Sequence, residues 1–307
     1  MKRRTFLKKS LQIGMGAGAY LVFGNRPWSS AADAPQANTL FDMVAIKGAE
    51  PEIMFDRAIQ SLGGISHFVK PNRTVLVKPN IGWDVPPERA GNTHPGLVKH
   101  VVKACLNAGA KSVYVFDHTC DNWSKSYANS GIEHAVKEAG GKMVPGNTER
   151  YYQRVDIPGG KSLSHAKVHE LVLDSDVFIN VPVLKSHGGA KLTIAMKNLM
   201  GIVWDRRFWH RNDLHQCIAD FAAFRKPDLN IIDAYFVMKQ NGPRGVSTAD
   251  LVTMKSQIIA TDMVAADTAA AKLFGIDPAD VPYITIADRL GAGTMDLKKL
   301  NIDRIVL

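Results

Sequence analysis

Cysteine is scarce in this sequence, and its spacing excludes a common use of the residue. The 307 residues include only Cys105, Cys120 and Cys217, with no Cys-x-x-Cys pair and no ferredoxin-type run. The chain therefore lacks the four thiolates that usually hold an iron–sulfur cluster. Cys105 shares a predicted helix face with Val101 and Val102, so we expect it to be a small buried hydrophobic residue.

The signatures of several enzyme classes are also missing. The sequence contains no glycine-rich dinucleotide fingerprint, P-loop, serine nucleophile elbow or His-Glu-x-x-His pair. No standard motif therefore assigns a reaction, a metal or a cofactor to this chain.

Acidic residues are absent from the N-terminal end, and this accounts for most of the net charge. The formal charge is +9, and residues 1–32 hold six of the basic residues without a single acid. The rest of the chain is nearly balanced and has no basic stripe interleaved with aromatic residues. This distribution argues against nucleic-acid binding.

The basic N-terminus resembles an export signal of the twin-arginine type. Arg3-Arg4-Thr5-Phe6-Leu7-Lys8 precedes a weakly apolar, glycine-rich segment from Leu11 to Phe23, and small residues near Ser30 suit cleavage. The apolar segment is shorter than the ~20 residues of a membrane span, so we expect no stable span after cleavage. The predicted organisation is a signal peptide over 1–32, a linker over 33–40 and one α/β domain over 41–307, located in the periplasm.

The domain itself alternates between apolar strand patterns and amphipathic helix patterns. This alternation predicts an α/β fold with a mainly parallel, doubly wound sheet and helices on both faces. Val177 to Val181 is apolar enough to be an interior strand, and Pro182 should end it. Residues 191–200 have the composition of a helix, and residues 146–169 have a weaker pattern that predicts a loop or small insertion.

Polar residues recur where the predicted strands end. Lys78-Pro79-Asn80, Asp117 to Asp121, Lys185-Ser186-His187 and Asp233 each follow an apolar strand. In a doubly wound sheet the carboxyl ends of the strands line one crevice, so these residues should converge. We expect the lysine amines to lie on an exposed rim.

These positions predict a site for a small anionic ligand or cofactor. The groups expected to hold negative charge or fix its geometry are Lys78, Asn80, Lys185, Lys197, Asn198 and Arg244. His94, beside a helix start, and His187 are the candidates for acid/base catalysis or for orienting the ligand. The alternative is solvated lysines in ordinary loops.

Two neighbouring segments carry further alternatives. Asp117, His118 and Cys120 offer metal ligands that His187 or Asp233 would complete, and a Cys120–His118 pair is a weaker candidate nucleophile. Residues 204–211 are rich in aromatic and cationic side chains. They would form a lid over the crevice in which Arg206, Arg207 or Arg211 binds an anion, or else a packed surface loop or a partner contact.

Four short motifs resemble the uncharacterised domain-of-unknown-function family 362. They are Lys185-Ser186-His187, Lys197-Asn198-Leu199-Met200-Gly201, Val77-Lys78-Pro79-Asn80 and Thr93-His94-Pro95, within a resemblance that runs from about Val75 to Leu290. The resemblance implies an association with iron–sulfur proteins and a remote likeness to the nickel-dependent lactate racemase fold. In its cysteine content this chain departs from the members linked to iron–sulfur proteins.

Three functions stay open at this point. The leading one is an exported protein that binds an anionic ligand or cofactor in a cationic crevice, with a redox- or cofactor-linked enzymatic role. The second is a non-catalytic periplasmic accessory or ligand-binding protein, with a redox enzyme as its partner. The third is a metal-dependent hydrolase or isomerase.

Overall fold

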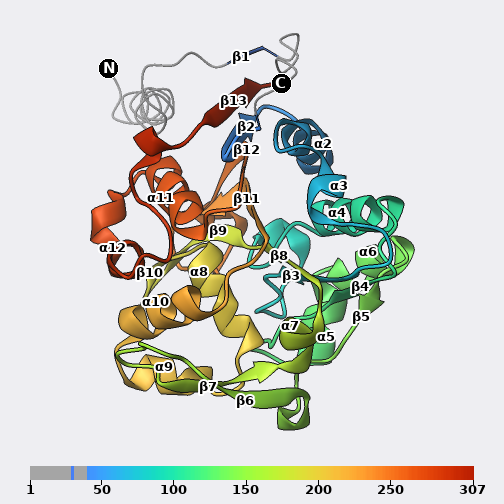
Figure 1. The fold of residues 1–307 in the computed structure, drawn as a ribbon. Helices are drawn as coiled ribbons and strands as arrows, with labels where there is room; N and C mark the ends of the chain where they lie inside the picture. Colours follow the sequence, from blue (N-terminus) through green and yellow to red (C-terminus); the bar gives the residue numbers. More distant parts are fainter. Residues whose placement is uncertain (1–28, 31–39) are drawn as a thin grey trace.

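The computed structural model describes Ser29–Ser30 and residues 40–307 (Figure 1). The predicted export signal and linker lie outside the described residues, apart from Ser29–Ser30 and Leu40. None of the helices in the described part of the chain is long and apolar enough to cross a bilayer.

Helices and strands alternate along most of the described chain. The helices are α2 (Pro51–Ser61), α3 (Ile65–Phe68), α4 (Pro95–Asn107), α5 (Trp123–Asn129), α6 (Ile132–Glu138), α7 (Glu170–Asp174), α8 (Ala195–Asn198), α9 (Arg206–Arg211), α10 (Leu214–Phe224), α11 (Met263–Phe274) and α12 (Pro282–Arg289). The strands are β1 (Ser29–Ser30), β2 (Met43–Lys47), β3 (Thr74–Pro79), β4 (Ser112–Val115), β5 (Lys142–Met143), β6 (Tyr152–Asp156), β7 (His165–His169), β8 (Val177–Val181), β9 (Val183–His187), β10 (Lys191–Thr193), β11 (Leu229–Met238), β12 (Leu251–Ala260) and β13 (Ile302–Val306).

One large sheet organises the molecule, in the order β1-β13-β2-β12-β11-β8-β3-β4-β5. Most neighbours are parallel, whereas β12 runs antiparallel to both β11 and β2. The first strand of the domain, β2, lies between β12 and β13, so the two ends of the described domain meet at one side of the sheet. The prediction of a mainly parallel α/β sheet is confirmed, and its antiparallel exceptions are β12 and the β9–β10 pair, which also belongs to this sheet.

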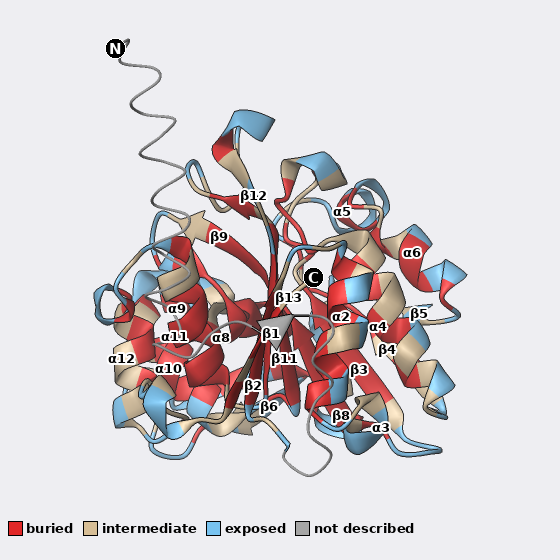
Figure 2. Ribbon diagram, turned by 90° about the horizontal axis from the view of Figure 1, so that it is seen from above, coloured by how far each residue is buried: buried red, intermediate tan, exposed pale blue. Residues whose placement is uncertain are grey.

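Helices cover both faces of this sheet, as Figure 2 shows. One face packs against α2, α4 and α6, and the other against α8, α10, α11 and α12. The sequence of β8 explains its interior position, since all five of its residues are buried and alternate between the faces. Phe178 joins one core, and Val177, Ile179 and Val181 join the other.

The chain beyond β8 differs from the sequence-based prediction. Pro182 interrupts the strand for one residue, and β9 then continues through Lys185 and His187 and pairs with β11 and β10. The helix predicted over residues 191–200 is wrong in its first part, because Lys191–Thr193 forms β10 and the helix begins only at Ala195. A turn at Gly188-Gly189 makes this hairpin, and Lys191 follows it at a φ of 66°.

The predicted loop over residues 146–169 is also partly wrong. It contains β6 and β7, an antiparallel pair that forms a separate two-stranded sheet. The β7 side is linked to the segment before α9 by a bridge between Val168 and Val203.

Candidate functional site

A cavity of about 340 Å³ lies where β3, β4, β9 and β11 reach their carboxyl ends. We call this cavity the lysine crevice, because three lysines from three segments line it. Its lining residues are Lys78, Asn80, Gly82, Trp83, Asp117, Cys120, Lys185, His187, Gly188, Gly189, Thr193, Lys197, Asn198, Met200, Gly201, Arg206, His210, Gly242 and Pro243. The structure thus brings together six of the eight residues that the sequence singled out.

Lys78 lies at the end of β3 and is held in a buried ion pair. Its amine is 2.9 Å from Asp117 Oδ1 and donates to Asn198 Oδ1 at 2.9 Å. Burial lowers the pKa of Lys78, and the Asp117 carboxylate opposes this shift. Gly201 is required here, because a Cβ at this position would lie 1.8 Å from Asp117 Oδ1 and 2.6 Å from the Lys78 amine.

Lys185 occupies the middle of β9 and is buried rather than exposed. Its side chain is 1% accessible, and its amine donates to Asn80 Oδ1 at 3.0 Å and to the Gly91 carbonyl at 2.5 Å. The expectation of an exposed rim is therefore wrong for Lys185, as it is for Lys78. Both acceptors are neutral, so burial lowers the pKa of Lys185 to about 7.

Lys197 differs from the other two lysines in having no partner. This half-buried side chain of α8 forms no hydrogen bond or ion pair with any residue that the structure describes. Burial lowers the pKa of its ammonium to about 8. The positive charge of Arg206 in the same cavity adds to this shift.

A chain of hydrogen-bonded asparagine side chains, most of them buried, adjoins the crevice. Asn198 accepts from Asn80 Nδ2 at 2.9 Å and donates to Asn180 Oδ1 at 2.8 Å. Asn180 in turn donates to Asn230 Oδ1 at 3.0 Å, which ties β3, α8, β8 and β11 together. Because each amide is hydrogen-bonded, the polar network lies in the interior at little cost.

His187 points one ring nitrogen at the turn that follows β9. Its Nδ1 accepts from the backbone N–H groups of Gly189 at 3.1 Å and Ala190 at 3.0 Å. Burial, and then the charges of Lys197 and Lys185, lower the pKa of His187 to about 3. The ring is therefore neutral at physiological pH.

Two predicted site residues lie elsewhere in the described structure. His94 precedes α4, and its backbone N–H donates to Asp233 Oδ2 at 2.8 Å, away from the residues that line the crevice. Arg244 is exposed, and its nearest charged partner is Asp121, at 3.5 Å. The catalytic role predicted for His94 and the binding role predicted for Arg244 stay untested predictions, and neither belongs to the lysine crevice.

The segment from Asp117 to Cys120 does not form the metal site considered from the sequence. Asp117 pairs with Lys78, while His118 stacks on Trp204 at 4.9 Å and its Nδ1 lies 3.1 Å from the Val203 carbonyl. Within the described residues, no group of three or more His, Cys, Asp or Glu side chains is arranged to hold a metal.

Arg206 and Thr193 also line the crevice. The sequence had suggested Arg206 as an anion-binding residue of a lid, but it had not marked Thr193. Arg206, at the start of α9, donates to the carbonyls of His118 and Thr119. The abundance of cationic residues in 204–211 was the available signal for Arg206. Thr193 gave no signal, because only the β9–β10 pairing brings it opposite Lys185.

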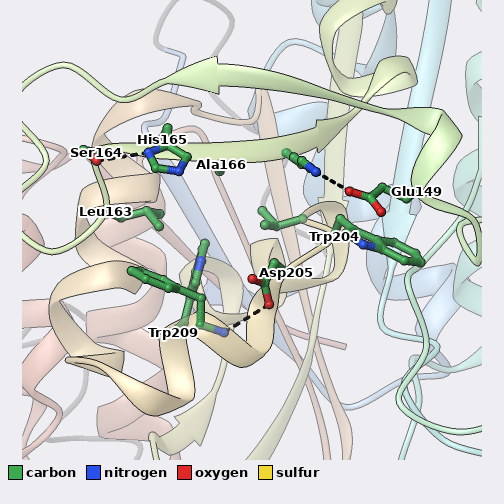
Figure 3. Close-up of a pocket in the computed structure, with 11 residues that line it drawn as sticks. Glu149, Leu163, Ser164, His165, Ala166, Trp204, Asp205 and Trp209 are labelled. Carbon is green, nitrogen blue, oxygen red and sulfur yellow. Dashed lines mark hydrogen bonds and ion pairs between the residues drawn. The ribbon is translucent and has the colours of Figure 1, made fainter.

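A second pocket of about 240 Å³ lies between the β6–β7 sheet and α9 (Figure 3). Trp204, Asp205 and Trp209 line one side of it, and Glu149 and His165 lie on the other. Glu149 pairs with Lys167, and Asp205 caps α9 by accepting from Phe208 N–H. These charges already have partners, which makes the lysine crevice the stronger candidate site.

Sequence comparisons with known proteins found a family and a relative. The model of the domain of unknown function DUF362 matches residues 75–272, more than half of the chain. A thylakoid-associated protein of Synechocystis sp. is 29% identical over 244 residues, which cover 76% of this chain and 73% of that protein.

Two solved structures are also similar to the chain. The lactate racemase apoprotein from Thermoanaerobacterium thermosaccharolyticum is 12% identical with a TM-score of 0.44, and the match covers 69% of this chain and 53% of that one. A protein from Thermotoga maritima is 11% identical with a TM-score of 0.48, over 79% of this chain and 60% of that one. The chain spans less than two thirds of the length of either structure.

Proposed function

The chain belongs to the DUF362 family, and from the chemistry of its site we propose that it binds a small anionic ligand in the lysine crevice. The observation that carries this proposal is the excess of positive charge in the crevice, part of it buried. Lys78, Lys185, Lys197 and Arg206 line the crevice together with one carboxylate, that of Asp117. Lys78 already uses that carboxylate.

Uncompensated buried charge is costly, and a bound anion removes the cost. An ammonium taken out of water loses hydration energy unless an opposite charge or hydrogen-bond acceptors replace the water. Lys185 has two neutral acceptors, and Lys197 has none in the described structure. An anion between them supplies charge-assisted hydrogen bonds of about 1.5–3 kcal/mol each.

The donors in the crevice define the class of ligand. The ammonium groups of Lys185 and Lys197 and the Nε2–H of neutral His187 all donate protons. An acceptor-rich group, a carboxylate or a phosphate, complements this set. The cavity of about 340 Å³ lies near the lower end of the range for small-molecule pockets, ~300–1,000 Å³, so the ligand is small.

The site also contains a group suited to proton transfer, which favours an enzymatic role. Lys185 has a pKa of about 7 and lies in the wall of the crevice, so its amine gains and loses a proton near neutral pH. We propose proton transfer by Lys185 as the second function, dependent on the first.

The replacement of Lys197 by Met tests the proposal with the least damage to the fold. Because this amine has no partner in the described structure, Lys197→Met removes a charge without breaking a contact. We expect the affinity for phosphate, sulfate or oxalate, measured by isothermal titration calorimetry at pH 7, to fall about tenfold or more, since 1.4 kcal/mol is one decade.

The matched control is Lys161→Met, which removes the same charge from an exposed position outside the crevice. The control should bind as the unmodified protein does. The proposal fails if the unmodified protein binds none of these anions, or if Lys197→Met and Lys161→Met bind equally well.

A further inference from the structure

Cys120 is a free, exposed thiol in the wall of the lysine crevice. It lies in the loop that follows β4, and its backbone N–H donates to the Gly82 carbonyl at 2.8 Å. A Cβ at Gly82 would be 4.0 Å from the Cys120 sulfur, so the loops after β3 and β4 touch at this point. The backbone therefore holds the thiol at a fixed place beside the lysines.

The charge around this thiol is positive. The carboxylate of Asp117 forms an ion pair with Lys78. Neither Lys185 nor Lys197 forms an ion pair with a carboxylate of the described residues. Burial lowers the pKa of both of these lysines, and both line the same cavity as Cys120. An anion drawn to Lys185 and Lys197 thus arrives next to the sulfur.

Thr193 supplies an independent sign that a ligand occupies this place. Its side chain is 3% exposed and lines the crevice, yet its hydroxyl has no hydrogen-bond partner among the described residues. A buried hydroxyl left without a partner costs about 1–3 kcal/mol. A ligand acceptor in the crevice would satisfy it.

We infer that Cys120 is a nucleophile toward small anionic electrophiles whose charged group is held by Lys197 and Thr193. In this step the thiol first releases its proton to water. The sulfur then attacks the electrophilic carbon, an S–C bond forms, and the bond from that carbon to its leaving group breaks, the leaving group keeping the electron pair. The inference rests on the proposed anion binding and adds a covalent step to it.

Two alkylating reagents with the same leaving group and different charge test this inference. Iodoacetate is an anion and iodoacetamide is neutral, and each transfers its carbon to sulfur with loss of iodide. The quantity to measure, by peptide mass spectrometry, is the rate of Cys120 alkylation by iodoacetate divided by the rate by iodoacetamide. We expect this ratio to be about tenfold or more higher in the folded protein than in urea-unfolded protein, because the positive charge of the crevice attracts the anionic reagent. Lys197→Met should lower the ratio, whereas Lys161→Met should not.

Sulfate binding, measured in parallel by calorimetry, separates the two claims. If sulfate binds but the ratio in folded protein equals that in unfolded protein, Cys120 has no role toward anions and anion binding stands. If sulfate does not bind and the ratio is unchanged, both proposals are wrong. Alkylation of the buried Cys105 or Cys217 in preference to Cys120 would also overturn the inference.

Discussion

His187 is held in one protonation state by the backbone of the turn beside it. A ring nitrogen that accepts two N–H groups cannot carry a proton, so the neutral ring keeps its hydrogen on Nε2. His187 lines the crevice, and its second ring nitrogen is therefore a hydrogen-bond donor. Of the two roles that the sequence suggested, this geometry favours orienting a ligand over exchanging protons with it.

Nuclear magnetic resonance of ¹⁵N-histidine tests this state. Because the pKa of His187 is lowered to about 3, we expect its Nδ1 resonance to stay in the unprotonated range from pH 8 down to pH 5. In urea the same ring should titrate near ~6.5. The His187→Asn spectrum assigns the signal, and a titration of His187 above pH 5 in folded protein contradicts the prediction.

At the scale of residues, the sequence was informative about location and uninformative about burial. Lys78 and Lys185 could be placed at the crevice because each follows an apolar strand, and parallel strands end at one edge of a sheet. Their burial depends on acceptors far away in sequence, such as Asp117 and Gly91, which no local pattern reveals. Arg244 lies outside the lining of the crevice, although its neighbours Gly242 and Pro243 belong to it.

Helix α8 carries Lys197 and Asn198, and its position depends on one carboxyl group in another helix. Asp267 of α11 is fully buried and accepts from the backbone N–H groups of Ala195 at 2.7 Å and Met196 at 3.1 Å. These are donors that a helix start leaves without partners. Asp267 thus fixes where α8 begins and where its side chains reach the crevice.

Asp267→Asn should weaken this anchor and the anion site together. The amide replaces one acceptor by a donor that faces a backbone N–H, so we expect a loss of about 1–3 kcal/mol in the free energy of unfolding. Asp262→Asn is the control, because Asp262 caps α11 through Val264 and Ala265 without touching α8. Urea unfolding and calorimetry should show that both variants lose stability and that only Asp267→Asn loses sulfate affinity. Equal affinities would contradict the anchoring role.

At the scale of elements, long apolar strands were predicted well and the short β9–β10 hairpin was not. The strand β8 has four apolar residues and one asparagine, and all five are buried, whereas a surface helix of the same length would need a polar side. Residues 191–193 have ordinary helical composition, but the Gly188-Gly189 turn folds them back onto β9. In such a short segment, pairing with a neighbouring strand outweighs the helical propensity of its residues.

Across the whole molecule, the buried lysines make stability depend on pH. Lys185 and Lys197 have pKa values of about 7 and 8 in the folded protein, against ~10.4 in an unfolded chain. Between these values the unfolded chain binds more protons than the folded one. Their contribution to stability is therefore lowest below pH 7 and rises toward pH 10.

Urea unfolding at pH 7, 8 and 9 measures this effect. Lys185→Met removes one of the two groups, so the slope of the unfolding free energy against pH should decrease, by at most about 1.4 kcal/mol per pH unit. Saturating sulfate should flatten the slope of the unmodified protein, because a bound anion keeps the lysines protonated. Identical slopes for the unmodified protein and Lys185→Met would show that Lys185 is not shifted.

The place of β2 in the sheet has a consequence for how the chain reaches its fold. Ile46 pairs with Gln257 of β12 on one side and with Ile305 of β13 on the other. The first strand of the domain therefore cannot complete its pairing before the last two strands have been synthesised. During synthesis, both hydrogen-bonding edges of β2 stay open until nearly the whole chain has left the ribosome. Contacts between segments so far apart in the sequence slow folding. Until they form, the unpaired edges of β2 stay exposed and prone to aggregation. We therefore expect refolding of the separated N-terminal half to leave β2 unpaired and prone to aggregation.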